Sequence, residues 1–266
     1  MHLFPAIDLL GGRAVRLLRG DYEQVTVYHE QPAQLARSFQ DAGASWLHVV
    51  DLDGARAGAP VNTDTILEIA RNCPGLRIEV GGGLRAPDDI AALLEGGVTR
   101  AILGSRLATD FDFVSAAVER FGPEALVAGV DARAGRVATQ GWTEQAALAA
   151  ADLVARLADL GLRHLVYTDI ARDGARTGID AALYTRVSEQ AGFPVIVSGG
   201  VATLDDLRAA RSLGSACVEG VIVGRALYER AFTLPEALAV LEGGNEDKGA
   251  GQSEGASEDA GAPDAG

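Results

Sequence analysis

The sequence predicts an α/β protein, a (β/α)8 (TIM) barrel with a two-fold internal repeat of half-barrels. Eight short apolar segments alternate with eight longer amphipathic segments, which is the order of parallel strands connected by helices. Related motifs recur in the two halves of the chain at a nearly constant spacing. The length of 266 residues suits one barrel of about 250 residues. An open, doubly wound sheet is the alternative architecture.

The expected strands are runs of three to five residues rich in Val, Ile and Leu, as in strands buried on both faces. They are Leu3–Ile7, Trp46–Val50, Arg77–Val80, Arg100–Leu103, Leu126–Val130, His164–Thr168, Val195–Val197 and Val221–Val223. The expected helices have apolar residues at helical spacing, and Asp110 and Thr233 stand where N-caps are expected. They are Pro32–Ala42, Thr63–Asn72, Pro87–Glu95, Phe111–Phe121, Glu144–Leu160, Ala181–Ala191, Leu204–Leu213 and Leu234–Leu241.

The end of the chain differs in composition from the rest. Beyond Glu242 the sequence consists mostly of Gly, Ala, Ser, Glu and Asp, and it cannot bury enough apolar surface to offset the entropy lost on ordering. We therefore expect residues 1–242 to form the barrel, with half-barrels of about 1–122 and 123–242, and residues 243–266 to form a disordered acidic tail.

Charge and cysteine content restrict the class of protein. The net charge of −14 argues against nucleic acid and anionic membranes as partners, because both require clustered cations. Cys73 and Cys217 lack the spacing of metal ligands and are expected to be free thiols. The N-terminus has no signal-peptide pattern, so we expect a cytoplasmic protein, most simply a monomer, that acts on a small molecule.

The internal repeat is the most informative feature of the sequence. Four pairs of motifs are separated by 117 to 123 residues. Their central residues are Asp8 and Asp131, Asp53 and Asp173, Gly82 and Gly199, and Gly104 and Gly224. Four matches at nearly one period are unlikely to arise by chance, and two half-barrels that face each other explain them.

Two aspartates are the candidate acid–base pair. Asp8 and Asp131 follow the first and fifth expected strands, which lie opposite each other in an eight-stranded barrel. Active sites of such barrels lie at the carboxyl ends of the strands. The two carboxylates should therefore face each other, so that one removes a proton while the other supplies one, as aldose–ketose isomerisation requires. A single strand-end aspartate would more simply be a helix cap.

Two glycine-rich pairs of loops predict two phosphate sites on opposite sides of the mouth. Small residues let backbone N–H groups approach phosphate oxygens, and arginines at both ends add charge. The candidate residues are Gly82, Gly83, Arg85, Gly104 and Ser105 in the first half, and Gly199, Gly200, Gly224 and Arg225 in the second. One Gly-Gly pair alone would indicate only a tight turn.

Further candidates lie near the same expected mouth. Thr168 would orient a neighbouring carboxylate, and Asp173 would hold ligand hydroxyls or help to open a sugar ring, although Asp173-Gly174 alone reads as a turn. The expected substrate contacts are Arg19 in a mobile glycine-flanked loop, His48, Trp142 and Asp169. A core position for His48 and ordinary packing for Trp142 are the alternatives.

Over about residues 2–242, these motifs resemble the phosphoribosylformimino-5-aminoimidazole carboxamide ribotide isomerases of histidine biosynthesis. The matching motifs are Pro5-Ala-Ile-Asp8, Gly12-Arg-Ala-Val-Arg16-Leu, His48-Val-Val-Asp51-Leu-Asp53, Gly81-Gly-Gly-Leu-Arg85, Thr168-Asp-Ile-Ala-Arg-Asp173-Gly and Ser198-Gly-Gly-Val201. The chain departs from the family at Leu84, where isoleucine is commoner, and at Gly178-Ile-Asp180, which replaces Gly-Pro-Asn.

The resemblance implies an Amadori rearrangement of an aminoaldose that bears two phosphates, without metal or cofactor. By motif, Asp8 would be the proton acceptor, Asp131 the donor assisted by Thr168, and Asp173 a second candidate acid; the order of the steps stays open. Three alternatives remain: a dual-function isomerase that also accepts phosphoribosyl anthranilate, the sister cyclase that makes the imidazole ring, and a non-catalytic phosphosugar-binding barrel.

Overall fold

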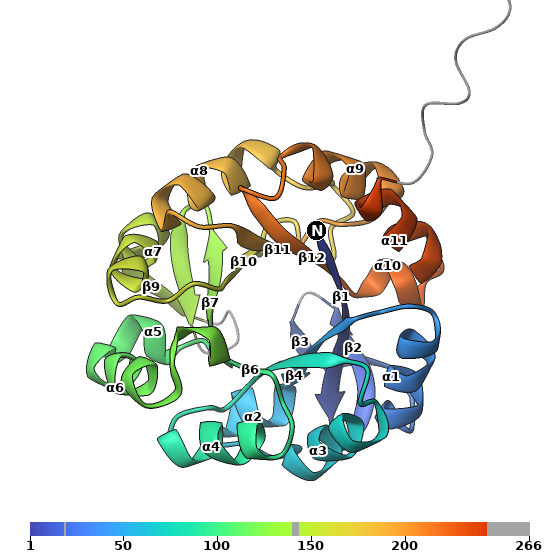
Figure 1. The fold of residues 1–266 in the computed structure, drawn as a ribbon, viewed down its shortest axis with the longest axis horizontal. Coiled ribbons are helices and arrows are strands. Elements are labelled where there is room, and N and C mark those ends of the chain that lie inside the picture. The colour runs from blue at the N-terminus through green and yellow to red at the C-terminus, as the bar shows by residue number, and fades with distance from the viewer. Residues whose placement is uncertain (19, 140–143, 244–266) are drawn as a thin grey trace, which may run out of the picture.

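The computed structural model describes residues 1–18, 20–139 and 144–243, and these form a closed parallel barrel surrounded by helices (Figure 1). The barrel strands pair in the order β1-β4-β5-β6-β7-β10-β11-β12, and β12 pairs with β1 to close the ring. Their bounds are β1 His2–Leu10, β4 Trp46–Asp51, β5 Arg77–Gly81, β6 Arg100–Leu103, β7 Leu126–Arg133, β10 Leu165–Asp169, β11 Val195–Ser198 and β12 Val218–Val223. The predicted (β/α)8 fold is confirmed, and the open sheet is excluded.

The outer layer contains eight helices of nine or more residues among the described part of the chain. They are α1 Pro32–Asp41, α3 Thr63–Asn72, α4 Pro87–Glu95, α6 Phe111–Phe121, α7 Ala150–Asp159, α8 Ala181–Ala191, α9 Leu204–Ser212 and α11 Leu234–Glu242. The expected caps are present: Asp110 accepts a hydrogen bond from Phe113 N at 3.0 Å, and Thr233 forms a capping box with Glu236. Short helices occupy connecting segments: α2 Leu52–Ala57, α5 Arg106–Thr109, η1 Pro123–Ala125 and α10 Arg225–Tyr228.

Two antiparallel extensions replace segments that were expected to be a loop or a helix. The predicted mobile loop after the first strand contains β2 Arg13–Leu18, which pairs with β1 and with the strand that follows, β3 Asp21–His29. After β7, β8 Arg136–Thr139 pairs with β9 Glu144–Ala149, so the helix predicted from Glu144 begins only at Ala150. The alanine-rich segment favours a helix locally, but antiparallel pairing with the preceding strand β8 overrides that preference.

Alternation along the barrel strands separates two apolar layers. In β1, Phe4 and Ala6 belong to a small cluster inside the barrel, whereas Leu3, Ile7 and Leu9 belong to the larger core beneath the helices. This period of two follows from the strand geometry. The inward positions nearest the carboxyl ends are therefore the ones that can carry functional groups, because the lower positions are filled with apolar side chains.

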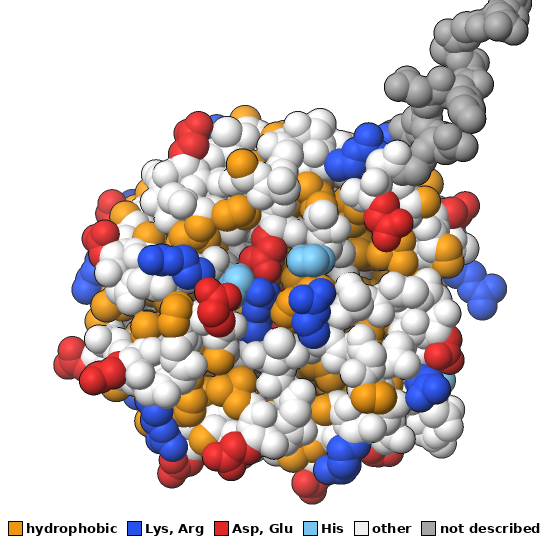
Figure 2. All heavy atoms as spheres, viewed as in Figure 1, with side chains coloured by type: hydrophobic (Ala, Val, Ile, Leu, Met, Phe, Trp, Pro, Cys, Tyr) orange, Lys and Arg blue, Asp and Glu red, His pale blue; other side chains and the backbone are white. Residues whose placement is uncertain are grey.

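The opposite end of the barrel is closed by charged and aromatic side chains. Arg100 Nη1 lies 2.8 Å from Glu219 Oε1, and His164 Nδ1 lies 2.9 Å from Glu219 Oε2. The guanidinium carbons of Arg77 and Arg100 lie 4.5 and 4.4 Å from the Trp46 ring centroid. Figure 2 shows basic, acidic and histidine side chains together near the middle of the face that carries the N-terminus. This network separates the barrel interior from solvent at the amino ends of the strands.

Both cysteines of the chain lie in the described residues. Cys73 and Cys217 are both free, as predicted. None of the helices in the described ranges has the length and apolar character needed to span a bilayer. The predicted tail beyond Gly243 lies outside the described residues, as do Arg19 and Trp142.

Candidate active site

A cavity of about 630 Å³ opens at the carboxyl ends of the barrel strands. Among the described residues, the predicted site residues that line it are Asp8, His48, Gly82, Gly83, Arg85, Gly104, Ser105, Asp131, Thr168, Asp173, Gly199, Gly200, Gly224 and Arg225. They come from all eight barrel strands or the loops that follow them. The structure therefore brings most of the predicted residues to one place.

Asp8 and Asp131 lie on opposite walls of this cavity. β1 and β7 are separated by three strands in either direction around the ring. Both residues lie within their strands and not after them, because the antiparallel extensions lengthen β1 to Leu10 and β7 to Arg133. Thr168 is the register partner of Asp131 on β10, and it is buried beside the cavity. The opposed arrangement of the two carboxylates agrees with the geometry that the repeat predicted.

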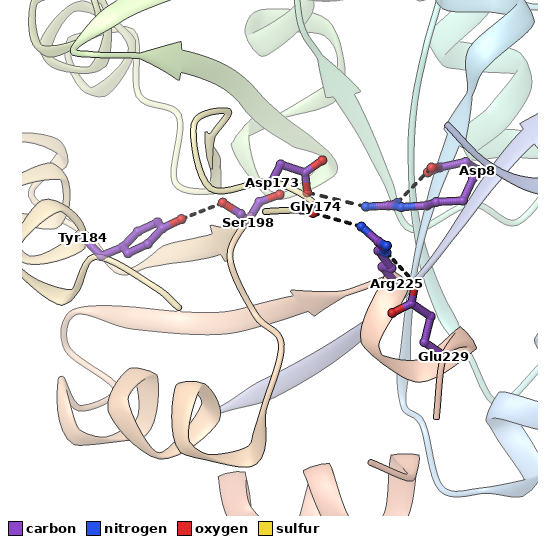
Figure 3. Close-up of polar contacts among 8 residues, drawn as sticks. Asp8, Asp173, Gly174, Tyr184, Ser198, Arg225 and Glu229 are labelled. Carbon is purple, nitrogen blue, oxygen red and sulfur yellow. Dashed lines mark hydrogen bonds and ion pairs between the residues drawn. The ribbon is translucent and has the colours of Figure 1, made fainter. Parts of the chain in front are cut away.

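Arg16 joins two of the cavity carboxylates, and its role was missed in the sequence. Its Nη1 donates to Asp8 Oδ2 at 2.9 Å, and its Nη2 donates to Asp173 Oδ1 at 3.5 Å (Figure 3). The three side chains are only 13 to 20% exposed. No alternating pattern in β2 signals this role, because Ala14 and Val15 are both buried and the register shifts between them; only the tertiary contacts reveal it.

Burial and mutual charge shift the protonation of this group. Burial raises the pKa of Asp173; the charge of Arg16 opposes the shift, while the carboxylates of Asp8 and Asp131 add to it. Burial alone would lower the pKa of Arg16, but Asp8 and Asp173 raise it above its ordinary value. Arg16 therefore stays a cation, and Asp173 has the environment of a carboxyl group that retains its proton to higher pH.

Asp169 is placed differently from the prediction. Among the described residues that line the cavity, Asp169 is absent. Its Oδ1 accepts a hydrogen bond from Ala171 N at 3.2 Å, and its Oδ2 lies 3.3 Å from Arg172 Nε. Its repeat counterpart Asp51 is also a loop anchor, accepting from Gly54 N and Asn62 N at 2.8 and 2.9 Å. A substrate contact for Asp169 thus stays a prediction that the placement does not support.

His48 is both a buried barrel residue and a cavity residue. It lies on β4 and its Nδ1 is 2.7 Å from Glu79 Oε1 of the neighbouring strand. Glu79 is fully buried, and its Oε2 has no hydrogen-bond partner among the described residues. The contact fixes the imidazole ring by one nitrogen and leaves the other, Nε2, as the polar atom available to a ligand.

The paired glycines are required by the fold at both ends of the cavity. Gly82, Gly83, Gly199 and Gly200 have φ values of 110°, 78°, 85° and 92°. A Cβ atom on Gly83 would lie 2.6 Å from Gly54 O, and on Gly200 2.5 Å from Gly178 O. In each half, the loop after the preceding strand therefore packs directly on the glycine pair. The same pairs line the cavity, so close packing and anion approach both require a residue without a side chain.

The second loop of each pair differs between the halves. A Cβ atom on Gly224 would lie 2.9 Å from Arg16 Nη1, whereas one on Gly104 would meet nothing within 4 Å. Arg225 is not free, because its Nε donates to Glu229 Oε1 at 2.6 Å and its Nη1 to Gly174 O at 2.9 Å (Figure 3). The phosphate contacts predicted for these loops would therefore use their backbone N–H groups first.

The charge balance of the cavity differs from that of the chain. The described residues that line it include six arginines: Arg16, Arg85, Arg106, Arg172, Arg176 and Arg225. The same lining includes four carboxylates: Asp8, Asp131, Asp173 and Glu229. An excess of two positive charges in a protein of net charge −14 favours an anionic ligand at this position. No group of His, Cys, Asp and Glu suited to a metal ion occurs among the described residues.

Comparison with known proteins agrees with this geometry. A family of proteins described as "Histidine biosynthesis protein" matches residues 2–233. A protein of Desulfitobacterium hafniense (strain DSM 10664 / DCB-2) is 49% identical over 91% of this chain and 96% of its own length. Proteins of Chloroflexus aggregans and Dinoroseobacter shibae are 46% and 48% identical over 91% of this chain, and over 98% and 99% of their own lengths. All three are named 1-(5-phosphoribosyl)-5-((5-phosphoribosylamino)methylideneamino)imidazole-4-carboxamide isomerase. The chain therefore belongs to the family of histidine biosynthesis proteins.

Proposed function

We propose that this chain is the isomerase for which its relatives are named, and that it converts a phosphoribosyl aminoaldose into the aminoketose by an Amadori rearrangement. The observation that carries the proposal is the pair of opposed carboxylates, Asp8 on β1 and Asp131 on β7. They line one cavity in which the arginines outnumber the carboxylates. A barrel that only bound a phosphosugar would gain nothing from carboxylates beside an anionic ligand.

The reaction needs one proton donor and one acceptor. The donor protonates the ring oxygen of the ribose, the bond from C1 to that oxygen breaks, and a protonated C1=N group forms. The acceptor removes the proton on C2, and the C–H electrons form a C1=C2 bond while the C=N electrons return to nitrogen. Protonation at C1 and loss of the proton from the C2 hydroxyl then give the ketone. Each of these proton transfers is one that a positioned carboxyl group can perform.

Asp8 is the proposed acceptor, and Asp131 or Asp173 the donor. Asp173 is supported as the donor by its raised pKa, which burial causes, because a donor must keep its proton until the reaction. Asp131 is supported by its position opposite Asp8 and by Thr168 beside it in register. Arg16 holds Asp8 and Asp173 in fixed positions relative to each other.

Two phosphates fit the two ends of the cavity. Gly82, Gly83 and Gly104 line the cavity in the first half and Gly199, Gly200 and Gly224 line it in the second, so their backbone N–H groups are the proposed phosphate contacts. A ligand with a phosphate at each end would span the mouth with its reacting sugar between the carboxylates. The proposed chemistry needs no residue from a second copy, so we propose a monomer as the simplest state, and light scattering on the purified protein measures it directly.

The test is a direct assay of the purified chain with the aminoaldose, followed by the absorbance change of the rearrangement. We expect Asp8→Asn to reduce kcat by about 10²- to 10⁴-fold. We expect a loss of the same size from Asp131→Asn or from Asp173→Asn, depending on which of these two residues is the proton donor. Full activity of both Asp8→Asn and Asp131→Asn would refute the mechanism. Phosphoribosyl anthranilate offered to the same preparation separates single from dual function.

A further inference from the structure

Two aspartates that the repeat makes equivalent have different surroundings. Asp53 and Asp173 occupy corresponding loops after β4 and β10, yet only Asp173 lines the cavity among the described residues. Asp53 Oδ2 accepts hydrogen bonds from Gly11 N at 2.6 Å and from Asn62 Nδ2 at 2.8 Å. Asp53 is thus held at the hairpin turn, whereas the Asp173 carboxylate contacts Arg16 across the mouth.

The residues that precede α3 and α8 explain why Asp53 and Asp173 are held differently. Asn62 precedes α3 but makes no side-chain cap; its side chain turns back to Asp51 and Asp53, at 2.7 and 2.8 Å. Asp180 precedes α8 and caps it by accepting from Leu183 N at 3.0 Å. The second half therefore has no residue equivalent to Asn62 that holds the loop aspartate, and the loop of Asp173 is held from another side.

That other side is Glu229, which lies one residue beyond α10. Its Oε1 accepts from Arg225 Nε at 2.6 Å, and its Oε2 pairs with Arg176 of the loop after β10. Arg225 in turn donates to Gly174 O at 2.9 Å, and Gly174 is the residue next to Asp173 (Figure 3). One carboxylate thus connects the loop after β10 to the segment after β12 at two points. The first half has Thr109 at the corresponding position, so it lacks this connection.

From these contacts we infer that Glu229 is a positioning residue for the isomerisation: it holds Arg225 against the carbonyl oxygen of Gly174, the residue after Asp173, and so sets the place of the Asp173 carboxylate. The inference rests on the proposed function only for its kinetic consequence. Gly174 and Arg176 have φ values of 64° and 55°, so the loop turns sharply on both sides of the contacts. A segment of this shape needs external ties to keep one conformation.

Loss of the Glu229 charge has a specific consequence for Asp173. Arg225 already acts on the Asp173 carboxylate through its charge, and loss of the Glu229 carboxylate removes one of the two contacts that hold its guanidinium in place. Burial raises the pKa of Asp173, with Arg16 from β2 and Arg225 from α10 opposing, and Asp8 from β1 and Asp131 from β7 adding to the shift. A guanidinium that moves toward Asp173 lowers this pKa and displaces the carboxylate.

The experiment compares Glu229→Gln with the intact chain in two measurements. Carbon-13 NMR titration of aspartate carboxyls, with Asp173→Asn to assign the signal, reports the pKa of Asp173 without any substrate. Steady-state kinetics with the aminoaldose reports kcat and KM separately. Asp41→Asn is the matched control, since it removes the carboxylate of another Arg–carboxylate pair at i,i+4 spacing, Arg37–Asp41, away from the cavity.

We expect Glu229→Gln to lower the pKa of Asp173 and to reduce kcat by about 10- to 100-fold, the effect of a misplaced reacting group, with a smaller change in KM. Glu229→Asp should restore part of kcat, and Glu229→Gln should add little in an Arg225→Ala background, because the two residues act in series. An unchanged Asp173 titration, or a change in KM alone, would overturn the inference. If the intact chain does not turn over the aminoaldose, the proposed function fails, but the titration of Asp173 still tests whether Glu229 positions Arg225. If Glu229→Gln does not fold, Glu229→Asp and Arg225→Ala are compared with the intact chain in the same two measurements.

Discussion

Replacement of Arg16 by methionine tests whether the cavity carboxylates depend on one cation. Methionine keeps an unbranched side chain of similar reach but removes the charge and all donors. Asp8 would lose its partner at 2.9 Å and Asp173 its partner at 3.5 Å. Asp131 adds a third carboxylate whose charge Asp173 already feels. The variant would therefore leave like charges together in a partly buried space.

The size of the effect follows from the burial of the three side chains. An exposed ion pair contributes about 0–1 kcal/mol, and breaking a fully buried pair costs about 3–5 kcal/mol. Arg16, Asp8 and Asp173 are 20, 13 and 20% exposed, which is closer to the buried limit although the cavity admits solvent. We expect Arg16→Met to lower the free energy of unfolding by about 2 to 4 kcal/mol at neutral pH.

The pH dependence of this loss has a definite sign. The pKa of Asp173 is raised in the folded protein, so its contribution to stability is present below the unfolded pKa and is lost as pH rises through the folded pKa. Arg16 opposes that rise, and its removal raises the pKa further. The destabilisation should therefore be largest at neutral pH and smaller in acid, where Asp173 is protonated in both proteins.

Urea unfolding of the intact chain and Arg16→Met at several pH values measures this difference. Arg37→Met is the control, because Arg37 pairs with Asp41 on an exposed helix surface. Its effect should stay within about 1 kcal/mol at every pH. A loss for Arg16→Met that is no larger than the control, or that does not shrink in acid, would refute the reasoning that charge compensation holds this site together.

Three further predictions concern the glycine loops, the network at the amino ends of the barrel strands, and the contact between α10 and β1. Gly83 has a φ of 78°, and a Cβ there would lie 2.6 Å from Gly54 O, so Gly83→Ala should lower the free energy of unfolding by about 1–3 kcal/mol. Gly104→Ala is the control and should unfold in urea like the intact chain, because its Cβ would meet nothing within 4 Å. Equal urea midpoints for the two variants would contradict this prediction. Burial opposes ionisation of Glu219, but the hydrogen bonds and charges of His164 and Arg100 prevail and lower its pKa, so its stabilisation is present above the unfolded pKa and is lost as pH falls through the folded pKa. Glu219→Gln should therefore lower the free energy of unfolding by about 3 kcal/mol at neutral pH. In thermal melts the difference in stability between this variant and the intact chain should become smaller in acid, and a difference that does not change with pH would contradict the prediction. Tyr228→Phe removes the hydrogen bond to Ala6 O at 2.7 Å and should lower the free energy of unfolding by about 1 kcal/mol, measured in the same thermal melts. An unchanged stability would contradict this and would show that water replaces the hydroxyl.

Much of the fold is visible in the sequence because the signals are local. The spacing of apolar residues that defines β6, α3, α4 and α6 lies within the elements themselves, and their observed bounds equal the predicted ones. The second antiparallel extension was not predictable in this way. Glu144–Ala149 is alanine-rich and favours a helix locally, and only its pairing with Arg136–Thr139 makes it a strand.

The sequence by itself determined the parallel barrel, its repeated motifs and the opposition of Asp8 and Asp131, since strand order and a fixed register place residues of like position around one ring. Tertiary structure alone decided that Arg16 joins Asp8 to Asp173, that Asp169 anchors a loop, and that Glu229 ties Arg225 to the peptide of Gly174. Two of these contacts, Arg16 with Asp173 and Arg225 with Gly174, join residues from different βα units, 157 and 51 positions apart in the chain. No local pattern encodes such pairs, because each depends on how the loops and hairpins of separate units pack above the same strands.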